Sequence, residues 1–177
     1  MISKKKILCI ILARGGSKSV KNKNIKKLNG IPLILYSLYA AKKSKYLDKV
    51  IVSSDSKEII NIVTKNKFEA PFVRPKNLSK DTTKNNDAFL HALKWIEKED
   101  KINYDYIIQL QCTNPFIEAK DIDNVILKLH KTQADSVISM CKTSSFHPSR
   151  IKKIVDDKIK DFAVKEKPFS NRQSLKP

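Results

Sequence analysis

Glycine is scarce in this chain, with three residues among 177. Two of them are adjacent, Gly15 and Gly16, and the third is Gly30. The spacing fits neither GxGxxG nor GxxxxGKS/T, which excludes the standard dinucleotide-binding and P-loop fingerprints. The adjacent pair still allows one tight turn that can present backbone N–H groups to a phosphate.

Cysteine and long apolar runs are also rare. The three cysteines, Cys9, Cys112 and Cys141, form no CxxC pair, so we expect reduced and mostly buried thiols in a cytoplasmic protein. The apolar run at the N-terminus spans only residues 7–13 and is followed by Arg14 rather than a cleavage site, so we interpret it as a buried strand and not a signal peptide. No run approaches the ~20 residues of a membrane span.

Acidic residues are few compared with basic ones. There are 36 Lys and Arg against 18 Asp and Glu, a net charge of +18, which would attract nucleotides, nucleic acid or acidic sugars. Lysine is spread along the whole chain, which favours a solvated basic surface over a designed patch. Nucleic-acid binding stays an alternative, but no DNA or RNA motif supports it, and we expect no nucleic-acid partner.

Apolar strand patterns alternate with amphipathic helix patterns. This order predicts an α/β domain with a mainly parallel sheet and helices on both faces, as one domain over residues 1–177. The expected strands are 7–12, 48–53, 69–73, 104–110 and 136–141, with a hairpin within 150–164; the expected helices are 32–44, 57–65, 88–98 and 120–131.

Ligands bind such sheets at the carboxyl ends of the strands. That rule places three polar segments on one rim: residues 14–24, 53–55 and 111–116. The first carries Arg14, Lys18 and Lys23 around the glycine pair, as a phosphate-binding loop would, although a plain surface turn remains an alternative. Asp55 could hold a ribose or a cation, but we favour a role in capping the helix that follows.

Several segments, in order, resemble the acylneuraminate (CMP-sialic acid-type) cytidylyltransferases. These are ILARGGSK with KN at positions 23 and 24, NGIPLILYSL, DKVIVSSD, FVRPKNLSKDTT, LQCTNPF, HPSR and NRQSLKP. The resemblance covers essentially the whole chain and implies a Rossmann-like, three-layer α/β nucleotidyltransferase. The implied reaction transfers CMP from CTP to a nine-carbon, sialic-type 2-keto sugar acid and releases pyrophosphate. Pseudaminic or legionaminic acid is an alternative acceptor.

The resemblance also implies roles for individual residues. Arg14 and Lys23 match phosphate-contacting positions and are the expected catalytic residues. Substrate-binding positions are Gln111, Arg150 and Arg172. The full expected nucleotide-binding set is Leu12, Ala13, Arg14, Gly15, Gly16, Ser17, Lys23, Asn24, Arg74 and Asn85.

The sequence departs from the family pattern at three places. Cys112 replaces a usual proline, and residues 113–117 lack the arginine that is common there in the family. The chain also ends at Pro177, where the family continues into a dimerisation element and paired aspartates associated with magnesium. The resemblance therefore implies Mg²⁺ and a homodimer of the complete protein, but the metal ligands stay unassigned. An inactive nucleotide-binding remnant is the alternative function.

Overall fold

The structure is a computed structural model, and it describes residues 2, 5–17, 20–80, 82–140, 152–156 and 158–161. The chain divides into two units, residues 1–137 and 138–177. The prediction of a single domain stays a prediction. No helix in the described part of the chain is long and apolar enough to cross a membrane.

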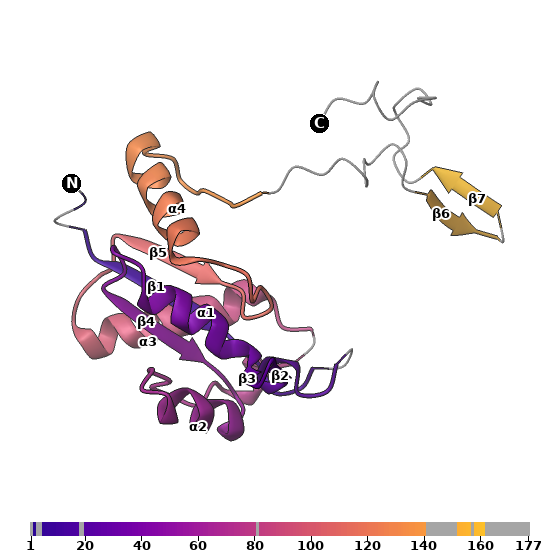
Figure 1. Cartoon of the computed structure of the whole chain (residues 1–177), viewed down its shortest axis with the longest axis horizontal. Helices are drawn as coiled ribbons and strands as arrows, with labels where there is room; N and C mark the ends of the chain where they lie inside the picture. The colour runs from indigo at the N-terminus through magenta and orange to yellow at the C-terminus, as the bar shows by residue number, and fades with distance from the viewer. Residues whose placement is uncertain are drawn as a thin grey trace. The chain divides into compact units, whose positions relative to one another are not determined.

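The first unit is built on a parallel sheet of three strands, shown in Figure 1. These are β1 (Ile7–Leu12), β4 (Lys49–Ser53) and β5 (Tyr106–Leu110), in the order β4-β1-β5. In the register, Cys9 of β1 lies opposite Val50 and Ile108. The uninterrupted apolar sequence of β1 suits this central position, because helices cover both of its faces.

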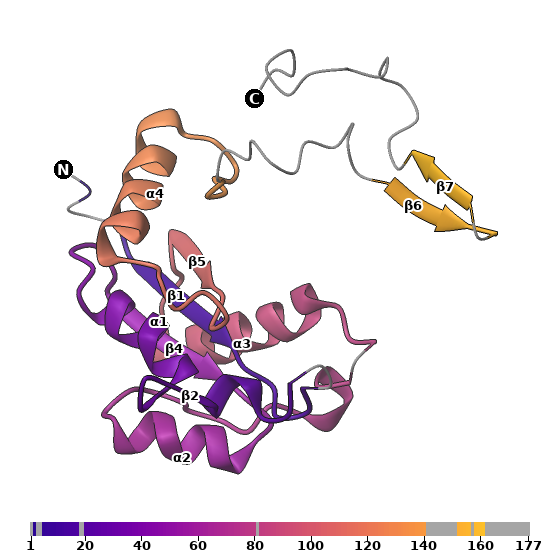
Figure 2. The same ribbon diagram turned by 45° about the vertical axis from the view of Figure 1, so that its right-hand side comes forward.

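Side chains of β1 alternate between two cores. Ile7, Cys9 and Ile11 pack in one cluster with α1 (Leu33–Lys42), α2 (Lys57–Lys65) and α4 (Ala119–Thr132). Leu8 and Ile10 pack in the other with α3 (Asn85–Asp100). The predicted three-layer α/β architecture is therefore confirmed, and Figure 2 shows the helices of the first unit around the sheet.

Local signals set where the helices begin. Ser56 caps α2 by accepting a hydrogen bond from the N–H of Ile59 at 3.4 Å, as the sequence suggested. Glu118 and Asp121 form a capping box at the start of α4. Ahead of α1, the short strands β2 (Lys27–Leu28) and β3 (Ile31–Pro32) pair across Asn29 and Gly30, both at positive φ as a tight hairpin requires.

Two predicted strands differ from the structure. Residues 69–73 run beside β4 but form only isolated parallel bridges, Ile51 with Glu69 and Ser54 with Val73. The predicted strand at 136–141 is wrong for residues 136–140, which the structure describes as irregular, with Ile138 and Met140 79% and 91% exposed. Cys141 lies outside the described residues. A β-prone sequence forms a strand only where a partner strand and a buried face are present.

The second unit contains the predicted hairpin. Strands β6 (Lys152–Val155) and β7 (Lys158–Asp161) pair antiparallel, with Ile154 opposite Ile159. Asp156 lies at a φ of 52° between them, a conformation that Asp tolerates in turns. The hairpin predicted within 150–164 is thus confirmed.

Candidate active site

A cavity of about 490 Å³ opens beyond the carboxyl ends of β1 and β5. One wall comes from the segment after β1 and from the 3-10 helix η1 (Lys23–Ile25). The other comes from the 3-10 helix η2 (Lys76–Leu78) and the start of α3. It is lined by Leu12, Arg14, Ser17, Lys23, Asn24, Arg74, Leu78, Ser79, Lys80, Thr83, Lys84, Asn85, Ala88, Gln111, Cys112 and Thr113.

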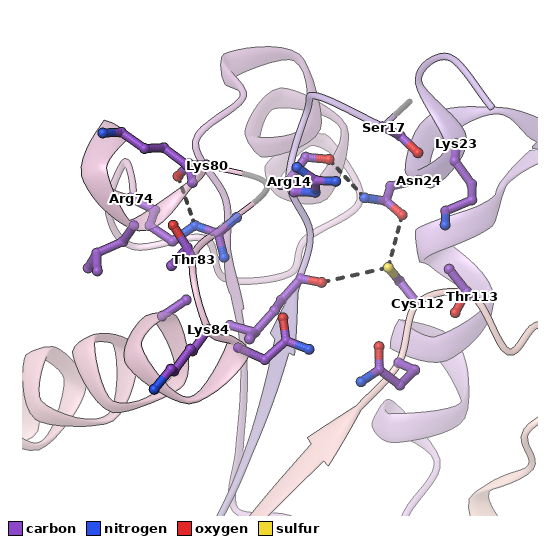
Figure 3. A pocket seen from close by; sticks show the side chains of 16 residues that line it. Arg14, Ser17, Lys23, Asn24, Arg74, Lys80, Thr83, Lys84, Cys112 and Thr113 are labelled. Atoms are coloured by element: carbon purple, nitrogen blue, oxygen red, sulfur yellow. Dashed lines mark hydrogen bonds between the residues drawn. The ribbon is translucent and has the colours of Figure 1, made fainter. Parts of the chain in front are cut away.

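All charged side chains among the described lining residues are basic. They are Arg14, Lys23, Arg74, Lys80 and Lys84, and the described part of the lining contains neither aspartate nor glutamate. In Figure 3, Lys23 lies on one side of the cavity and Arg74, Lys80 and Lys84 lie on the other, with Arg14 between them. Converging cations in a partly enclosed space are suited to a polyanion such as a triphosphate.

The turn after β1 depends on close contact with the segment after β4. The N–H of Gly15 donates to Oδ1 of Asp55 at 3.0 Å, and the N–H of Ser17 donates to the carbonyl of Gly15 at 3.0 Å. A Cβ on Gly15 would lie 3.0 Å from the Cβ of Ser56, whereas one on Gly16 would meet nothing within 4 Å. The approach of the next loop therefore favours glycine at position 15, because a larger side chain would force the two segments slightly apart.

Asn24 stabilises the same wall through hydrogen bonds of its buried side chain. Its side chain is buried, and Nδ2 donates to the carbonyl of Arg14 at 2.9 Å. The thiol of Cys112 donates to Oδ1 of Asn24 at 3.1 Å. Burial raises the pKa of Cys112, so the thiol stays protonated and remains a donor at neutral pH. These contacts join the loop after β1 to the loop after β5 (Figure 3).

Arg74 is the most deeply buried charge of the lining, at 4% exposure. Its Nη2 lies 3.6 Å from Oδ1 of Asp55, and its Nε donates to Oγ of Ser79 at 3.2 Å. Burial lowers the pKa of Arg74 and the like charge of Arg14 adds to this, while Asp55 opposes the shift. The Arg74 backbone N–H also donates to the carbonyl of Ser54 at 2.8 Å, which ties residue 74 to the end of β4.

The structure brings most of the sequence-predicted residues together. Those that line the cavity are Leu12, Arg14, Ser17, Lys23, Asn24, Arg74, Asn85 and Gln111. Ala13, Gly15 and Gly16 belong to the same loop but do not line the cavity. Gln111 follows β5 directly, and its carbonyl accepts from Oγ of Ser37 at 3.2 Å. Arg150 and Arg172 lie outside the described residues.

Sequence reasoning missed part of the lining. Lys80, Thr83 and Lys84 precede α3 and were not in the expected nucleotide-binding set. The available signal was the segment FVRPKNLSKDTT, which resembles the family and contains Lys80 and Thr83. Cys112 was noted only as a replacement for proline. Its contact with Asn24 joins residues 88 positions apart, so no local pattern could reveal it.

The interpretation of Asp55 was wrong. Asp55 was expected to cap α2, but its carboxylate is engaged by Gly15 and Arg74, and Ser56 provides the cap. Outside the cavity, His130 of α4 is half-buried, and its Nδ1 lies 3.0 Å from the hydroxyl of Tyr106.

The described residues do not provide a set of metal ligands. They contain no group of three or more His, Cys, Asp and Glu side chains placed to hold an ion. Asp55 is already bonded to Gly15 and paired with Arg74. The protein residues seen here therefore do not fit a Mg²⁺ site on their own.

Comparison with known proteins gives consistent matches. A model of the cytidylyltransferase family matches residues 8–176. The post-translational flagellin modification protein B of Campylobacter coli is 35% identical over 171 residues, covering 96% of this chain and 71% of that protein. The pseudaminic acid cytidylyltransferase of Campylobacter jejuni is 44% identical over 117 residues, covering 66% of this chain and 50% of that protein. The chain thus spans half the length of this second relative.

Among solved structures, the fold resembles CMP:2-keto-3-deoxy-manno-octonic acid synthetase complexed with CTP. The TM-score is 0.62 at 21% sequence identity, and the match covers 73% of this chain and 49% of that one. At this identity the likeness concerns the fold alone. It agrees with the parallel sheet and the helix layers described above.

Proposed function

Because this chain belongs to the cytidylyltransferase family, we propose that it transfers CMP from CTP to the anomeric hydroxyl of a nonulosonic, sialic-type 2-keto sugar acid. Pyrophosphate is the second product. The product would serve as an activated sugar for cell-surface polysaccharides or glycoconjugates.

The observation that carries this proposal is the cation-lined cavity at the carboxyl ends of β1 and β5. Five basic side chains contribute to its lining, and no carboxylate is among the lining residues that the structure describes. Arg14 and Lys23 come from the first wall, while Arg74 is held in place from the second. This arrangement supports binding of the triphosphate of CTP between the two walls.

In the proposed reaction, the anomeric oxygen attacks the α-phosphorus of CTP. The bond between that phosphorus and the oxygen bridging to the β-phosphate breaks, and pyrophosphate leaves with the electron pair while the hydroxyl proton passes to solvent. Nucleotidyl transfer depends chiefly on positioning and on neutralising phosphate charge. Arg14 and Lys23 are the residues proposed to supply that charge at the reacting phosphates.

The acceptor is proposed from chemistry and from the relatives. A 2-keto sugar acid carries a carboxylate that an arginine can bind through two parallel hydrogen bonds. Gln111 at the mouth of the cavity, with Arg150 and Arg172, is the proposed substrate-binding set. The name of the Campylobacter jejuni relative makes pseudaminic acid one of the acceptors to test, beside legionaminic and N-acetylneuraminic acid.

Magnesium is proposed as a companion of the nucleotide. The lining residues that the structure describes offer no carboxylate, so among them Mg²⁺ would depend on the phosphate oxygens of CTP, water and neutral side-chain oxygens. We also propose a cytoplasmic location, supported by the free buried thiols of Cys9 and Cys112, and a homodimer, supported by the family resemblance alone.

Pyrophosphate release tests the proposal. The protein is incubated with CTP, Mg²⁺ and, in separate reactions, pseudaminic, legionaminic and N-acetylneuraminic acid. Release with at least one of them, and with CTP in preference to ATP, GTP and UTP, is expected. CTP binding without release for any acceptor would instead identify a nucleotide-binding protein without transferase activity.

A further inference from the structure

We propose that Asp55 is a positioning residue that fixes the two cationic walls of the nucleotide cavity relative to each other. This inference rests on the proposed function, because it assigns Asp55 a role in CTP binding at that site. Asp55 does not line the cavity, and it acts through Gly15 and Arg74.

The first contact fixes the phosphate loop. Oδ1 of Asp55 accepts a hydrogen bond from the N–H of Gly15 at 3.0 Å. Gly15 also lies so close to Ser56 that a Cβ would come within 3.0 Å of the Ser56 Cβ. A charge-assisted bond and a close steric contact therefore set the position of the turn that carries Arg14.

The second contact fixes the opposite wall. The same oxygen of Asp55 lies 3.6 Å from Nη2 of Arg74, whose side chain is 4% exposed. A buried guanidinium requires a counter-charge, and Arg14 is a second cation close enough to disfavour the charged form of Arg74. Asp55 is the carboxylate that the structure pairs with Arg74.

One carboxylate oxygen therefore links residues that come from two different walls. Binding sites gain affinity when their charged groups are held in place before the ligand arrives, since less ordering is needed on binding. Ser79 supplements the link by accepting from Nε of Arg74 at 3.2 Å, but it has no contact with the Gly15 turn among the bonds described. Among the contacts described, those of Asp55 connect Gly15 with Arg74.

Simple electrostatics predicts the opposite effect of removing this charge. A carboxylate near a phosphate site repels CTP, so a neutral substitute should improve affinity if the charge acts only at a distance. If Asp55 acts by positioning, its loss should weaken CTP binding. Whether CTP affinity rises or falls when Asp55 is replaced therefore distinguishes a purely electrostatic effect from a positioning role.

The kinetic test compares Asp55→Asn, Asp55→Ala and the control Asp135→Asn. Asparagine keeps an acceptor for the N–H of Gly15 but loses the ion pair, whereas alanine loses both. We expect the KM for CTP to rise roughly tenfold in Asp55→Asn and further in Asp55→Ala. Asp135→Asn removes the same charge from an exposed residue outside the cavity and should leave the KM unchanged.

A double-mutant cycle tests whether Asp55 acts through Arg74. In the Arg74→Met background, Asp55→Asn should change the KM for CTP less than threefold, because its partner is already absent. An equal fold-change in both backgrounds, or a KM that falls in Asp55→Asn, overturns the proposal.

A third measurement does not depend on the reaction. Without nucleotide, hydrogen exchange at the Gly15 amide should be at least tenfold faster in Asp55→Ala than in the wild type, and little changed in Asp55→Asn. Unchanged exchange in Asp55→Ala contradicts the positioning role. If the wild type neither binds CTP nor releases pyrophosphate, the proposed function fails, while the exchange result still decides whether Asp55 holds the loop. If Asp55→Ala does not fold, Asp55→Asn and the cycle decide the matter.

Discussion

Gly15→Ala is the substitution for which the structure gives the most specific expectation. The new Cβ would lie 3.0 Å from the Cβ of Ser56 and 3.4 Å from its Oγ. Separations this short force the neighbouring atoms apart by a few tenths of an ångström. Because Ser56 caps α2, the Gly15 turn must move instead, and with it the N–H that donates to Asp55.

Overpacking of this kind costs about 1–3 kcal/mol. For a chain of 177 residues this corresponds to a fall of roughly 3–9 °C in melting temperature. Because Arg14 directly precedes Gly15, kcat/KM for CTP should fall about tenfold as the phosphate contacts lose their alignment. Differential scanning fluorimetry and a pyrophosphate-release assay measure the two effects on the same samples.

Two further variants test whether the effect of Gly15→Ala comes from steric contact with Ser56. Gly16→Ala adds the same methyl group where nothing lies within 4 Å, so its melting temperature should match the wild type. Ser56→Gly removes the opposing side chain at the cost of a few tenths of a kcal/mol for the cap, and combined with Gly15→Ala it should restore most of the lost activity. Equal loss in both glycine variants, or no rescue by Ser56→Gly, would refute the steric explanation.

Other consequences can be checked in the same way. Lys23→Met should lower kcat/KM for CTP about 30-fold by removing a phosphate-neutralising charge, whereas Lys45→Met, outside the cavity, should have no effect on it. Cys112→Ala should weaken CTP binding about fivefold by removing the donor to Asn24, and Cys112→Ser should recover part of the lost affinity. Cys9→Ala is the control for loss of a buried thiol elsewhere, and an equal loss of affinity in that variant would argue against a role for the Cys112–Asn24 contact. Burial works against the Asp100 carboxylate, but bonds from Lys49 and Tyr104 outweigh it and lower the pKa of Asp100 below its ordinary 3.8. The stabilisation is therefore present above pH ~4 and lost as the pH falls further, so Asp100→Asn should flatten the acid side of a plot of melting temperature against pH, and an unchanged slope would contradict it.

The sequence predicted the parts of the fold that short-range rules determine. The apolar run of residues 7–12 indicated a strand covered on both faces, and Ser56 marked the start of a helix that the structure begins at Lys57. Residues 136–140 show the limit of such rules. Their apolar side chains resemble a strand, but Ile138 and Met140 are exposed and no pairing is described there.

The candidate site likewise contains residues that the sequence identifies and one that it does not. Arg14, Lys23 and Arg74 could be identified because they stand in motifs that resemble a known family. The role of Asp55 could not be identified from the sequence, because it arises only when the segment after β1, the segment after β4 and Arg74 come together in the fold. Contacts between distant segments are decided by tertiary structure, which a local pattern does not encode.

A ³¹P NMR time course with CTP, Mg²⁺ and a nonulosonic acid follows the proposed CMP transfer directly. If the cavity binds and activates CTP, the three CTP resonances should disappear together, replaced by one signal for a CMP-sugar and one for pyrophosphate. In Arg14→Met and Lys23→Met the same change should be slowed about 30-fold or more. CTP signals that persist with every acceptor, or that convert equally fast in both variants, would contradict the claim that this cavity binds and activates CTP.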